Sequence, residues 1–392
     1  MKFLMKSVIH CSFLVLGLMG LNSASCWATQ IDILRTPSGG IQPQALVGND
    51  GTIHLIYFNG EAGAGDLFYT QSKGNDLTWF KSRQINQSPG AAMAIGSVRG
   101  AQLALGRDDW IHVAWMGSAK AKRAVVNGQE QAPMLYTRFK PKSDKFESEW
   151  NLLGTAGGLD GGGSLASDSS GRVAVVWHGH IGEAKGEQSR AVFATESLDD
   201  GSQFSVEKRI SPEGTGACGC CGIKTSYADG GILQVVFRGA AQMTNRAELI
   251  LSGIFDRGNF QVVNSAPWTI NNCPMSTAAL TQGKSTSFAA WETEGQVYWK
   301  QLQGIGDYSG KIMEPNNPNK RRKHPAIATN MRGEVLLAWT EGTGWLRGGR
   351  VAWQLFDKTG KPLQAIERRD GVPVWGLVTV VAKSDNNFAL IY

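Results

Sequence analysis

Charged side chains are scarce in this sequence. Asp, Glu, Lys and Arg make up 18% of its 392 residues, whereas globular proteins usually contain about a quarter. The formal net charge of +6 is modest for this length, so no nucleic-acid partner is expected. The densest basic run, at 320–324, suits a solvated loop, with binding of an anionic glycan or a phosphate as the alternative.

Long apolar runs and long helical patterns are also lacking. Outside the N-terminal segment, no run approaches the ~18 apolar residues that a membrane helix needs, so no transmembrane segment is expected. Glycine is abundant, with 49 residues, and so is tryptophan, with 13. This composition favours short strands and tight turns, and the hydrophobic content of 42% is enough for a sizeable core.

The N-terminal segment has the pattern of a secretory signal peptide, residues 1–28. Two lysines precede an apolar stretch at 12–21, and small residues lead to a cleavage point after Ala28. Lipid attachment at Cys26 is the alternative. We therefore expect a secreted or periplasmic protein whose residues 29–392 form a single domain.

A short apolar run that ends in an aromatic residue recurs along the chain. The aromatic residues stand roughly 50–60 residues apart, about the size of one four-stranded blade with its loops. A strand of small residues and a Gly or Asp turn precede each run, and in several copies a strand with alternating aromatics follows it. The seven runs are 53–57, 111–115, 173–177, 233–237, 287–291, 335–339 and 388–392.

This periodicity predicts an all-β fold, a β-propeller with seven blades, or with six if one copy is an insertion. The last copy has only two strands, at 378–381 and 388–392, and the mature N-terminus has a spare strand at 31–34. Pairing of these two ends would close the ring and leave no free edge. A β-sandwich or a β-solenoid is the remaining alternative.

A turn motif lies between the third and fourth strands of some repeats. The segment 197–204, Ser-Leu-Asp-Asp-Gly-Ser-Gln-Phe, resembles the Asp-box or BNR pattern Ser-x-Asp-x-Gly-x-Thr-Trp, and variants of it stand at 72–79 and 252–260. In this motif the Asp accepts hydrogen bonds from backbone amides, the Gly permits positive φ and the aromatic packs between sheets. It is a folding device and carries no catalysis.

On these repeats, the chain resembles the sialidase-like superfamily of exported bacterial proteins. The segments Cys218–Gly222 and Cys273–Met275, a CxCCG…CPM pattern, resemble a subgroup of it. The resemblance implies a propeller that binds a glycan, with sialidase-like glycoside hydrolysis as its catalytic form. Sialidases also carry a Phe/Tyr-Arg-Ile-Pro segment, and the segment 34–37 here, Leu-Arg-Thr-Pro, departs from it.

Propeller topology predicts where a site would lie. The loops that enter the first strand and leave the second strand of each repeat meet around one end of the axis, where ligands bind. Basic and aromatic residues in these loops are the expected ligand-binding set: Arg99, Arg238, Arg347, His324, Trp345 and Trp375. Acid or base groups are the expected catalytic set: Glu292, Glu341, Asp160 and His178.

The alternative for the charged members of these sets is structural. The three arginines Arg99, Arg238 and Arg347 would then pair with carboxylates and hold adjacent blades together. The carboxylates concerned are Asp160, Glu292 and Glu341.

Four cysteines remain after the leader: Cys218, Cys220, Cys221 and Cys273. In an oxidising compartment they first predict two disulfides, one of which joins Cys273 to a member of the Cys220–Cys221 pair, because a bridge between adjacent cysteines is strained. The alternative is a copper or zinc site that takes a further ligand from Met275, His178 or His324. No cofactor is favoured.

Three functions follow from these observations. The favoured one is a propeller that binds an anionic or polyhydroxylated glycan, with hydrolysis by two carboxylates as its catalytic form. The second is a periplasmic metal or redox protein built around the cysteines, and the third is an interaction scaffold without a small-molecule site. A monomer is expected, with a glycan or another small anion as its ligand.

Overall fold

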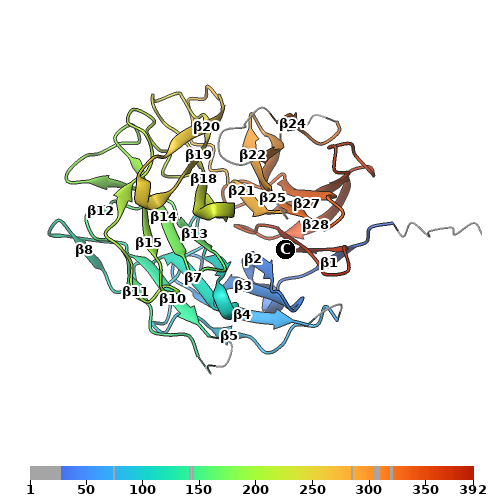
Figure 1. Ribbon diagram of the computed structural model, residues 1–392, viewed down its shortest axis with the longest axis horizontal. Coiled ribbons are helices and arrows are strands. Elements are labelled where there is room, and N and C mark those ends of the chain that lie inside the picture. The colour runs from blue at the N-terminus through green and yellow to red at the C-terminus, as the bar shows by residue number, and fades with distance from the viewer. Residues whose placement is uncertain are drawn as a thin grey trace, which may run out of the picture.

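Seven β-sheets stand around one axis in the computed structural model of the protein, which describes residues 28–73, 76–140, 143, 145–283, 286–302, 310–317 and 321–392. Figure 1 shows these sheets as sectors of a ring that the chain follows once, from the blue strands through green and yellow to the red ones. The first strand of each sheet contacts the first strand of the next, all the way around. The predicted all-β propeller with seven blades is confirmed, and the six-bladed alternative is wrong.

Blades 1 to 6 each contain four antiparallel strands, ordered from the axis outward. Blade 1 contains β2 (Ile41–Val47), β3 (Ile53–Asn59), β4 (Asp66–Ser72) and β5 (Arg83–Gln84). Blade 2 contains β6 (Gln102–Leu105), β7 (Ile111–Met116), β10 (Met134–Phe139) and β11 (Trp150–Asn151). Blade 3 contains β13 (Gly163–Ser167), β14 (Val173–Ile181), β15 (Ala191–Ser197) and β16 (Lys208–Arg209). Blade 4 contains β17 (Lys224–Ala228), β18 (Ile232–Arg238), β19 (Glu248–Gly253) and β20 (Gln261–Ala266). Blade 5 contains β21 (Ala279–Gln282), β22 (Ser287–Thr293), β23 (Gln296–Leu302) and β24 (Ile312–Met313). Blade 6 contains β25 (Arg322–Thr329), β26 (Val335–Glu341), β27 (Gly349–Phe356) and β28 (Glu367–Val372).

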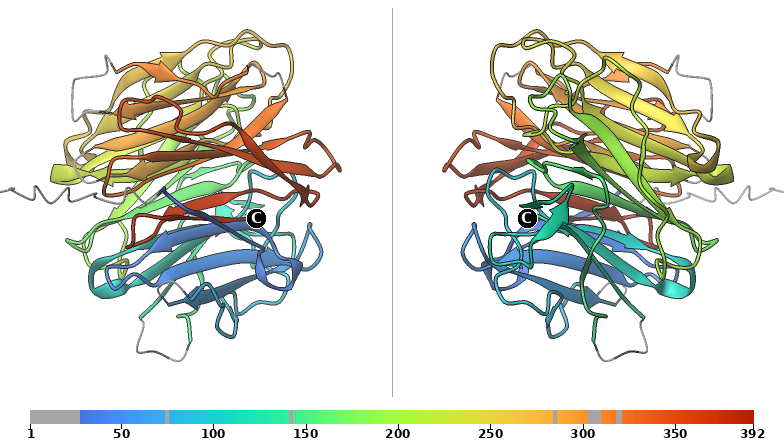
Figure 2. Two further views of the ribbon diagram at one scale, coloured as in Figure 1. Left: turned by 90° about the vertical axis from the view of Figure 1, so that its right-hand side faces the viewer. Right: turned by 90° about the vertical axis from the view of Figure 1, so that its left-hand side faces the viewer.

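The two ends of the chain close the ring in blade 7. This sheet contains β29 (Thr379–Ala382), β30 (Phe388–Ile391) and the N-terminal strand β1 (Ile31–Leu34), which pairs with β30 in parallel. The side view on the left of Figure 2 shows the blue β1 beside the red C-terminal strands. The predicted closure is therefore confirmed, whereas the predicted signal peptide lies, up to residue 27, outside the described residues.

Short strands and 3-10 turns accompany the strands of the seven blades. A hairpin and a short strand accompany blades 2 and 3: β8 (Ala124–Val126), β9 (Gln129–Gln131) and β12 (Ala156–Gly157), which pairs with β14. Four short 3-10 turns are η1 (Pro37–Gly39), η2 (Arg107–Asp109), η3 (Asp229–Gly231) and η4 (Phe255–Arg257). Among the described residues, no helix has the length and apolar character needed to cross a membrane.

The repeated aromatic residues fill the layers between blades. Trp115 of blade 2 packs in one cluster with Ile56 and Phe58 of blade 1, and Trp177 of blade 3 packs in another with Tyr136 of blade 2. Both tryptophan side chains are buried. Burial of one large ring at each layer supplies apolar contact that a single sheet cannot make alone, so the repeat requires its neighbours.

The turn at 197–204 joins β15 to β16 and contacts the neighbouring blade. Asp199 Oδ1 accepts hydrogen bonds from the Ser197 hydroxyl at 2.7 Å and from the Gln203 backbone amide at 3.0 Å. Gly201 has a φ of +75°, and a side chain there would collide with the Tyr136 hydroxyl. The Phe204 ring packs edge-on against Tyr136 of blade 2, so this turn fastens two blades together.

Candidate functional site

A channel of about 610 Å³ runs along the axis of the ring. At one level of the channel, one residue from the first strand of each blade lines the wall. Each of these residues pairs with the second-strand residue that comes just before the repeated aromatic. Most of these side chains are small or are amides, and one is cationic. The seven residues are Gln44, Gln102, Ser164, Ala279, Ala326, Thr379 and Lys224.

The cationic member, Lys224, crosses the channel. Its Nζ donates a hydrogen bond to Gln44 Oε1 at 2.9 Å and another to Gln102 Oε1. Lys224 belongs to blade 4 and the two glutamines to blades 1 and 2, so the side chain spans the axis. Burial lowers the pKa of Lys224 to about 8.

We expect Lys224 to make the protein more stable at alkaline pH. Because the folded chain gives up this proton near pH 8 and the unfolded chain near 10.5, the free energy of unfolding rises between those values. Because Lys224 is half-buried and lines the channel, the contribution is smaller than the roughly 3 kcal/mol that the full pKa difference would give. Urea unfolding from pH 7 to 10 measures it. In Lys224→Met the rise is expected to be absent, and an equally steep rise in that variant would contradict the assignment.

A second pocket, of about 220 Å³, lies at one mouth of the channel and shares Ser97 and His324 with it. We call it the mouth pocket. Loops before the first strands of blades 2, 5 and 7 form it, together with the start of β25 and the loop after the second strand of blade 6, at the end of the axis that the topology predicted. Six residues singled out in the sequence line it: Cys273, Met275, His324, Trp345, Arg347 and Trp375.

A tight hairpin presents the aromatic side of the mouth pocket. Gly344 and Arg347 exchange backbone hydrogen bonds of 3.1 Å, which leaves Trp345 and Leu346 at the tip. Trp345 is 59% exposed and meets Trp375 edge-on, with ring centroids 4.6 Å apart. The Arg347 guanidinium is exposed and, among the described residues, has no carboxylate within ion-pair distance.

The backbone around this pocket is unusual. Four non-glycine residues that line it have positive φ: Ser97 at +60°, Met275 at +48°, His324 at +51° and Trp375 at +61°. Each such conformation costs about 1–3 kcal/mol, and such residues concentrate at binding sites and active sites. This concentration makes the mouth pocket a candidate functional site.

Arg99 and Asp160 were expected near the axis, and the structure pairs them. Arg99 Nη2 lies 2.9 Å from Asp160 Oδ1, and Arg99 Nε donates to the Asp160 backbone oxygen at 2.6 Å. The pair joins the loop before blade 3 to that before blade 2. This is the structural alternative, so neither residue is placed as a free ligand-binding or catalytic group.

Arg238 and Glu292 do not reach the mouth pocket. Arg238 forms an ion pair of 2.7 Å with Glu248, and the two side chains are only 2% and 3% exposed. Arg238 Nη2 also donates to the backbone oxygen of Glu292, at 2.5 Å, rather than to its carboxylate. The expected Arg238–Glu292 ion pair is therefore wrong. Burial raises the pKa of Glu292, whose carboxylate is enclosed by protein.

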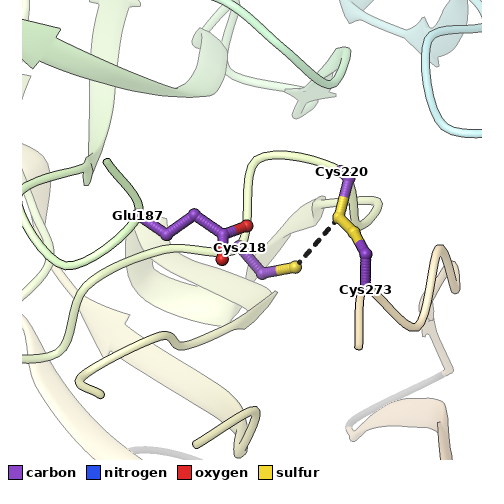
Figure 3. Close-up of side chains that lie close together, drawn as sticks. All are labelled: Glu187, Cys218, Cys220 and Cys273. Carbon is purple, nitrogen blue, oxygen red and sulfur yellow. Dashed lines mark hydrogen bonds between the residues drawn. A yellow bond between two sulfur atoms is a disulfide. The ribbon is translucent and has the colours of Figure 1, made fainter. Parts of the chain in front are cut away.

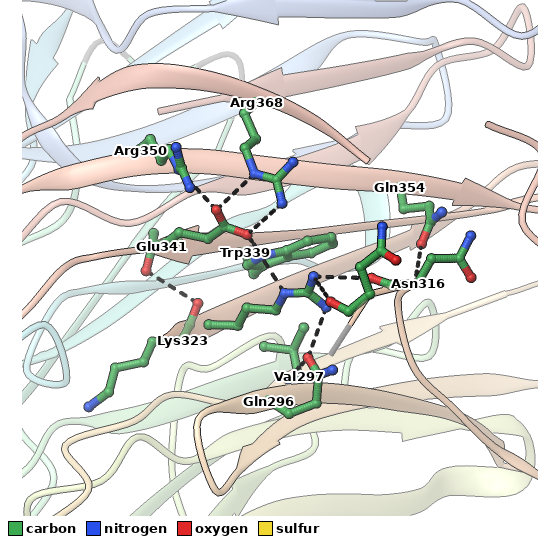
Figure 4. Close-up of polar contacts among 12 residues, drawn as sticks. Gln296, Val297, Asn316, Lys323, Trp339, Glu341, Arg350, Gln354 and Arg368 are labelled. Carbon is green, nitrogen blue, oxygen red and sulfur yellow. Dashed lines mark hydrogen bonds and ion pairs between the residues drawn. The ribbon is translucent and has the colours of Figure 1, made fainter. Parts of the chain in front are cut away.

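Glu341 lies at the centre of an arginine cluster (Figure 4). Its carboxylate accepts hydrogen bonds from Arg350 and Arg368, both at 2.9 Å, and lies 3.6 Å from Arg322 Nε. Burial alone would raise the pKa of Glu341, but hydrogen bonds from Arg368 and Trp339 outweigh it and hold the pKa below its usual value. The expected ion pair between Glu341 and Arg347 is therefore wrong. Because the lowered pKa keeps Glu341 ionised, it is poorly suited to act as a general acid.

The two histidines are neutral. Burial lowers the pKa of His178 and of His324 to about 3. His324 Nδ1 lies 3.3 Å from the Thr277 hydroxyl, whereas neither ring nitrogen of His178 has a hydrogen-bond partner in the part of the chain that the structure describes. His178 is enclosed, with 1% of its surface exposed, so it cannot touch a ligand in the mouth pocket.

The cysteines form one cluster of sulfur atoms (Figure 3). Cys220 and Cys273 form a disulfide, as expected for one member of the adjacent pair. The second expected disulfide is absent, because Cys218 and Cys221 are thiols, with 3.0 Å between their sulfurs. Burial tends to raise the pKa of Cys221, but the hydrogen bond from Cys218 and the charge of Arg238 keep it below its usual value. Glu187 lies beside this cluster.

Several lining residues of the mouth pocket escaped the sequence reasoning. Ser97 and Thr343 carry no pattern that marks them, and Lys323 was expected at this face before a first strand but was given no role in binding. Lys323 Nζ donates to the Pro274 backbone oxygen at 2.6 Å, which ties two loops of the pocket together. Met275 was proposed as a metal ligand, and the structure instead places it on the pocket wall.

Comparison with known proteins supports the fold. Neither a protein-family model nor a curated protein sequence matches this chain. A protein of unknown function from Dyadobacter fermentans has 11% identity and a TM-score of 0.54, with 87% of this chain and 96% of that one covered. An α-L-arabinanase from Penicillium chrysogenum, complexed with arabinobiose, has 10% identity and a TM-score of 0.52, with coverage of 84% and 98%.

A further similar structure is the α-L-arabinofuranosidase of Fusarium graminearum in complex with an iminosugar inhibitor. It has 12% identity and a TM-score of 0.51, and the match covers 80% of this chain and 93% of the fungal one. At such identities the likeness concerns the fold alone.

Proposed function

We propose that the protein is exported and binds an acidic glycan in the mouth pocket. The observation that carries the proposal is the exposed Arg347, which has no carboxylate partner among the described residues, beside the Trp345–Trp375 pair. Aromatic faces pack against sugar rings, and a guanidinium holds a carboxylate or sulfate in bidentate geometry. No Asp or Glu is among the described residues that line the pocket.

Binding without hydrolysis is the form of this function that we favour. Glycoside hydrolysis generally uses two carboxyl groups on either side of the scissile bond. Of the expected carboxylates, Glu292 is enclosed, Glu341 is held by arginines and Asp160 is paired with Arg99. The arabinanase and the arabinofuranosidase of similar fold were solved with sugar-like ligands, which supports a sugar ligand here as well.

Calorimetric titration of residues 29–392 tests the proposal. The ligands are a galacturonic acid oligosaccharide and its methyl ester, which differ only in charge. The acid is expected to bind at least about 10-fold more tightly than the ester. Trp345→Ala is expected to weaken both by about 10-fold or more, and Arg347→Ala to remove the preference for the acid.

Arg257→Ala is the matched control, since Arg257 is an exposed arginine in η4, at a turn between outer strands. Because His324, the one histidine among the described residues that line the pocket, has a pKa of about 3, affinity is expected to stay constant between about pH 5 and 8. Equal affinities for acid and ester, or an Arg347→Ala variant that behaves like Arg257→Ala, would refute the proposal.

A further inference from the structure

The cysteine cluster lies between blades 4 and 5, beside the mouth pocket. Cys218 and Cys220 lie on the loop before β17, and Cys273 lies on the loop before β21 (Figure 3). Cys221 follows Cys220 on the same loop. The Cys218 sulfur lies 3.3 Å from that of Cys220 and 3.0 Å from that of Cys221. Two chain segments thus bring four sulfur atoms together, of which two are thiols.

The loop that carries the two thiols is held by backbone hydrogen bonds. The Cys218 amide donates to the Arg238 carbonyl at 2.8 Å, and the Gly222 amide donates to the Ser276 carbonyl at 2.8 Å. The first bond fixes the loop to blade 4 and the second fixes it to the loop before blade 5. The disulfide adds a covalent link between the same two loops. The backbone that carries both thiols is therefore fixed, and to hold one metal ion between them the two sulfurs have to move apart from 3.0 Å by side-chain rotation.

The two thiols are enclosed by protein. Cys218 and Cys221 are buried and pack in one small cluster with Ala240, against which Cys220 also lies. A metal ion held by both sulfurs would therefore be shielded from bulk water.

We propose that Cys218 and Cys221 bind one Cu(I) ion, with the Cys220–Cys273 disulfide intact beside it. Binding replaces the two thiol protons with the metal, so two protons leave and no electron is transferred. Soft thiolates select Cu(I), zinc and iron–sulfur clusters among biological metals. Zinc takes four protein ligands in structural sites, whereas two thiolates are sufficient for Cu(I). The inference does not depend on the proposed glycan function.

The test uses residues 29–392 isolated without reductant. Two thiols per chain are expected after unfolding, and peptide mapping should assign them to Cys218 and Cys221. Anaerobic competition against a colorimetric Cu(I) chelator is then expected to show one tightly bound Cu(I) per chain. Cys221→Ser should weaken this binding by more than about 100-fold. Arg347→Ala, in the mouth pocket, should leave it unchanged, so failure of either proposal can be told from failure of the other.

A second measurement on the unsubstituted chain guards against misfolding of the variant. Bound Cu(I) should give the unsubstituted chain a thiolate-to-copper charge-transfer absorption in the ultraviolet, and the chelator in excess should remove it. The proposal is overturned if the isolated chain carries two disulfides and no thiol, or if Cys221→Ser binds Cu(I) as tightly as the parent. It is also overturned if metal is retained only as zinc after the Cys220–Cys273 bond has been reduced.

Discussion

Replacement of Arg238 by methionine is expected to lower the free energy of unfolding by about 3–5 kcal/mol. The change leaves Glu248 buried without its partner, since the two side chains face each other across β18 and β19 and are almost wholly enclosed. Burial raises the pKa of Glu248 to about 6 even though Arg238 opposes the shift. Equilibrium unfolding in urea at neutral pH measures the loss.

The pH dependence of this loss has a defined sign. The pKa of Glu248 is higher in the folded chain than in the unfolded one, so ionisation of Glu248 costs stability as the pH rises from about 4.5 to 6. Without Arg238 that cost grows. The deficit of Arg238→Met is therefore expected to be larger at pH 7.5 than at about pH 5.

A double variant separates the loss of the pair from the loss of packing. In Arg238→Met/Glu248→Leu no unpaired charge remains, and most of the lost stability should return. The control is Arg257→Met, because Arg257 is exposed in η4 and forms no ion pair with the described residues, so its loss should cost less than about 1 kcal/mol. A double variant as unstable as Arg238→Met would contradict the explanation.

The fold was predictable because its signal is repeated and local. Each repeat needs an apolar second strand and a large ring to fill the layer before it, and Trp115 and Trp177 do this in consecutive blades. Ring closure was predictable because the sequence leaves an unpaired strand at each end, and β1 pairs with β30 accordingly. These features require no knowledge of side-chain contacts.

The expected residues reach the mouth pocket where they lie in loops beyond the ends of their strands. Trp345, Trp375 and Arg347 do line the mouth pocket, because the topology constrains the loops around the axis. Arg238 and Glu292 do not, because the second strands continue past the repeated aromatic. In those strands Arg238 still pairs with Glu248 and Glu292 with Val297, so their side chains enter the layers between blades. The position of a strand end is decided by its partner strand, which a single repeat does not reveal.

The second large effect is expected for Glu341→Gln, which should lower the free energy of unfolding by about 3 kcal/mol. The substitution keeps the shape of the side chain and removes the charge that balances Arg322, Arg350 and Arg368 (Figure 4). Arg322 is fully buried, so its charge cannot be compensated by water. Urea unfolding at pH 7 gives the difference.

The pH dependence of this effect has the opposite sign from that of Glu248. The folded chain lowers the pKa of Glu341, so its contribution is present above about pH 4.5 and is lost as the pH falls through the folded value. Parent and Glu341→Gln should therefore approach equal stability in acid. Glu367→Gln, an exposed carboxylate of the same blade, is the control and should change stability by less than about 0.5 kcal/mol.

The same variant decides between the two roles that Glu341 was given. A catalytic carboxylate can be replaced by its amide with loss of activity and little loss of stability, whereas a carboxylate that balances buried arginines shows the reverse. Restoration of stability by Arg322→Leu in the Glu341→Gln background would locate the unpaired charge at Arg322. Unchanged stability in Glu341→Gln would mean that the fold does not use this charge, and Glu341 would again be a candidate for chemistry at the mouth of the channel.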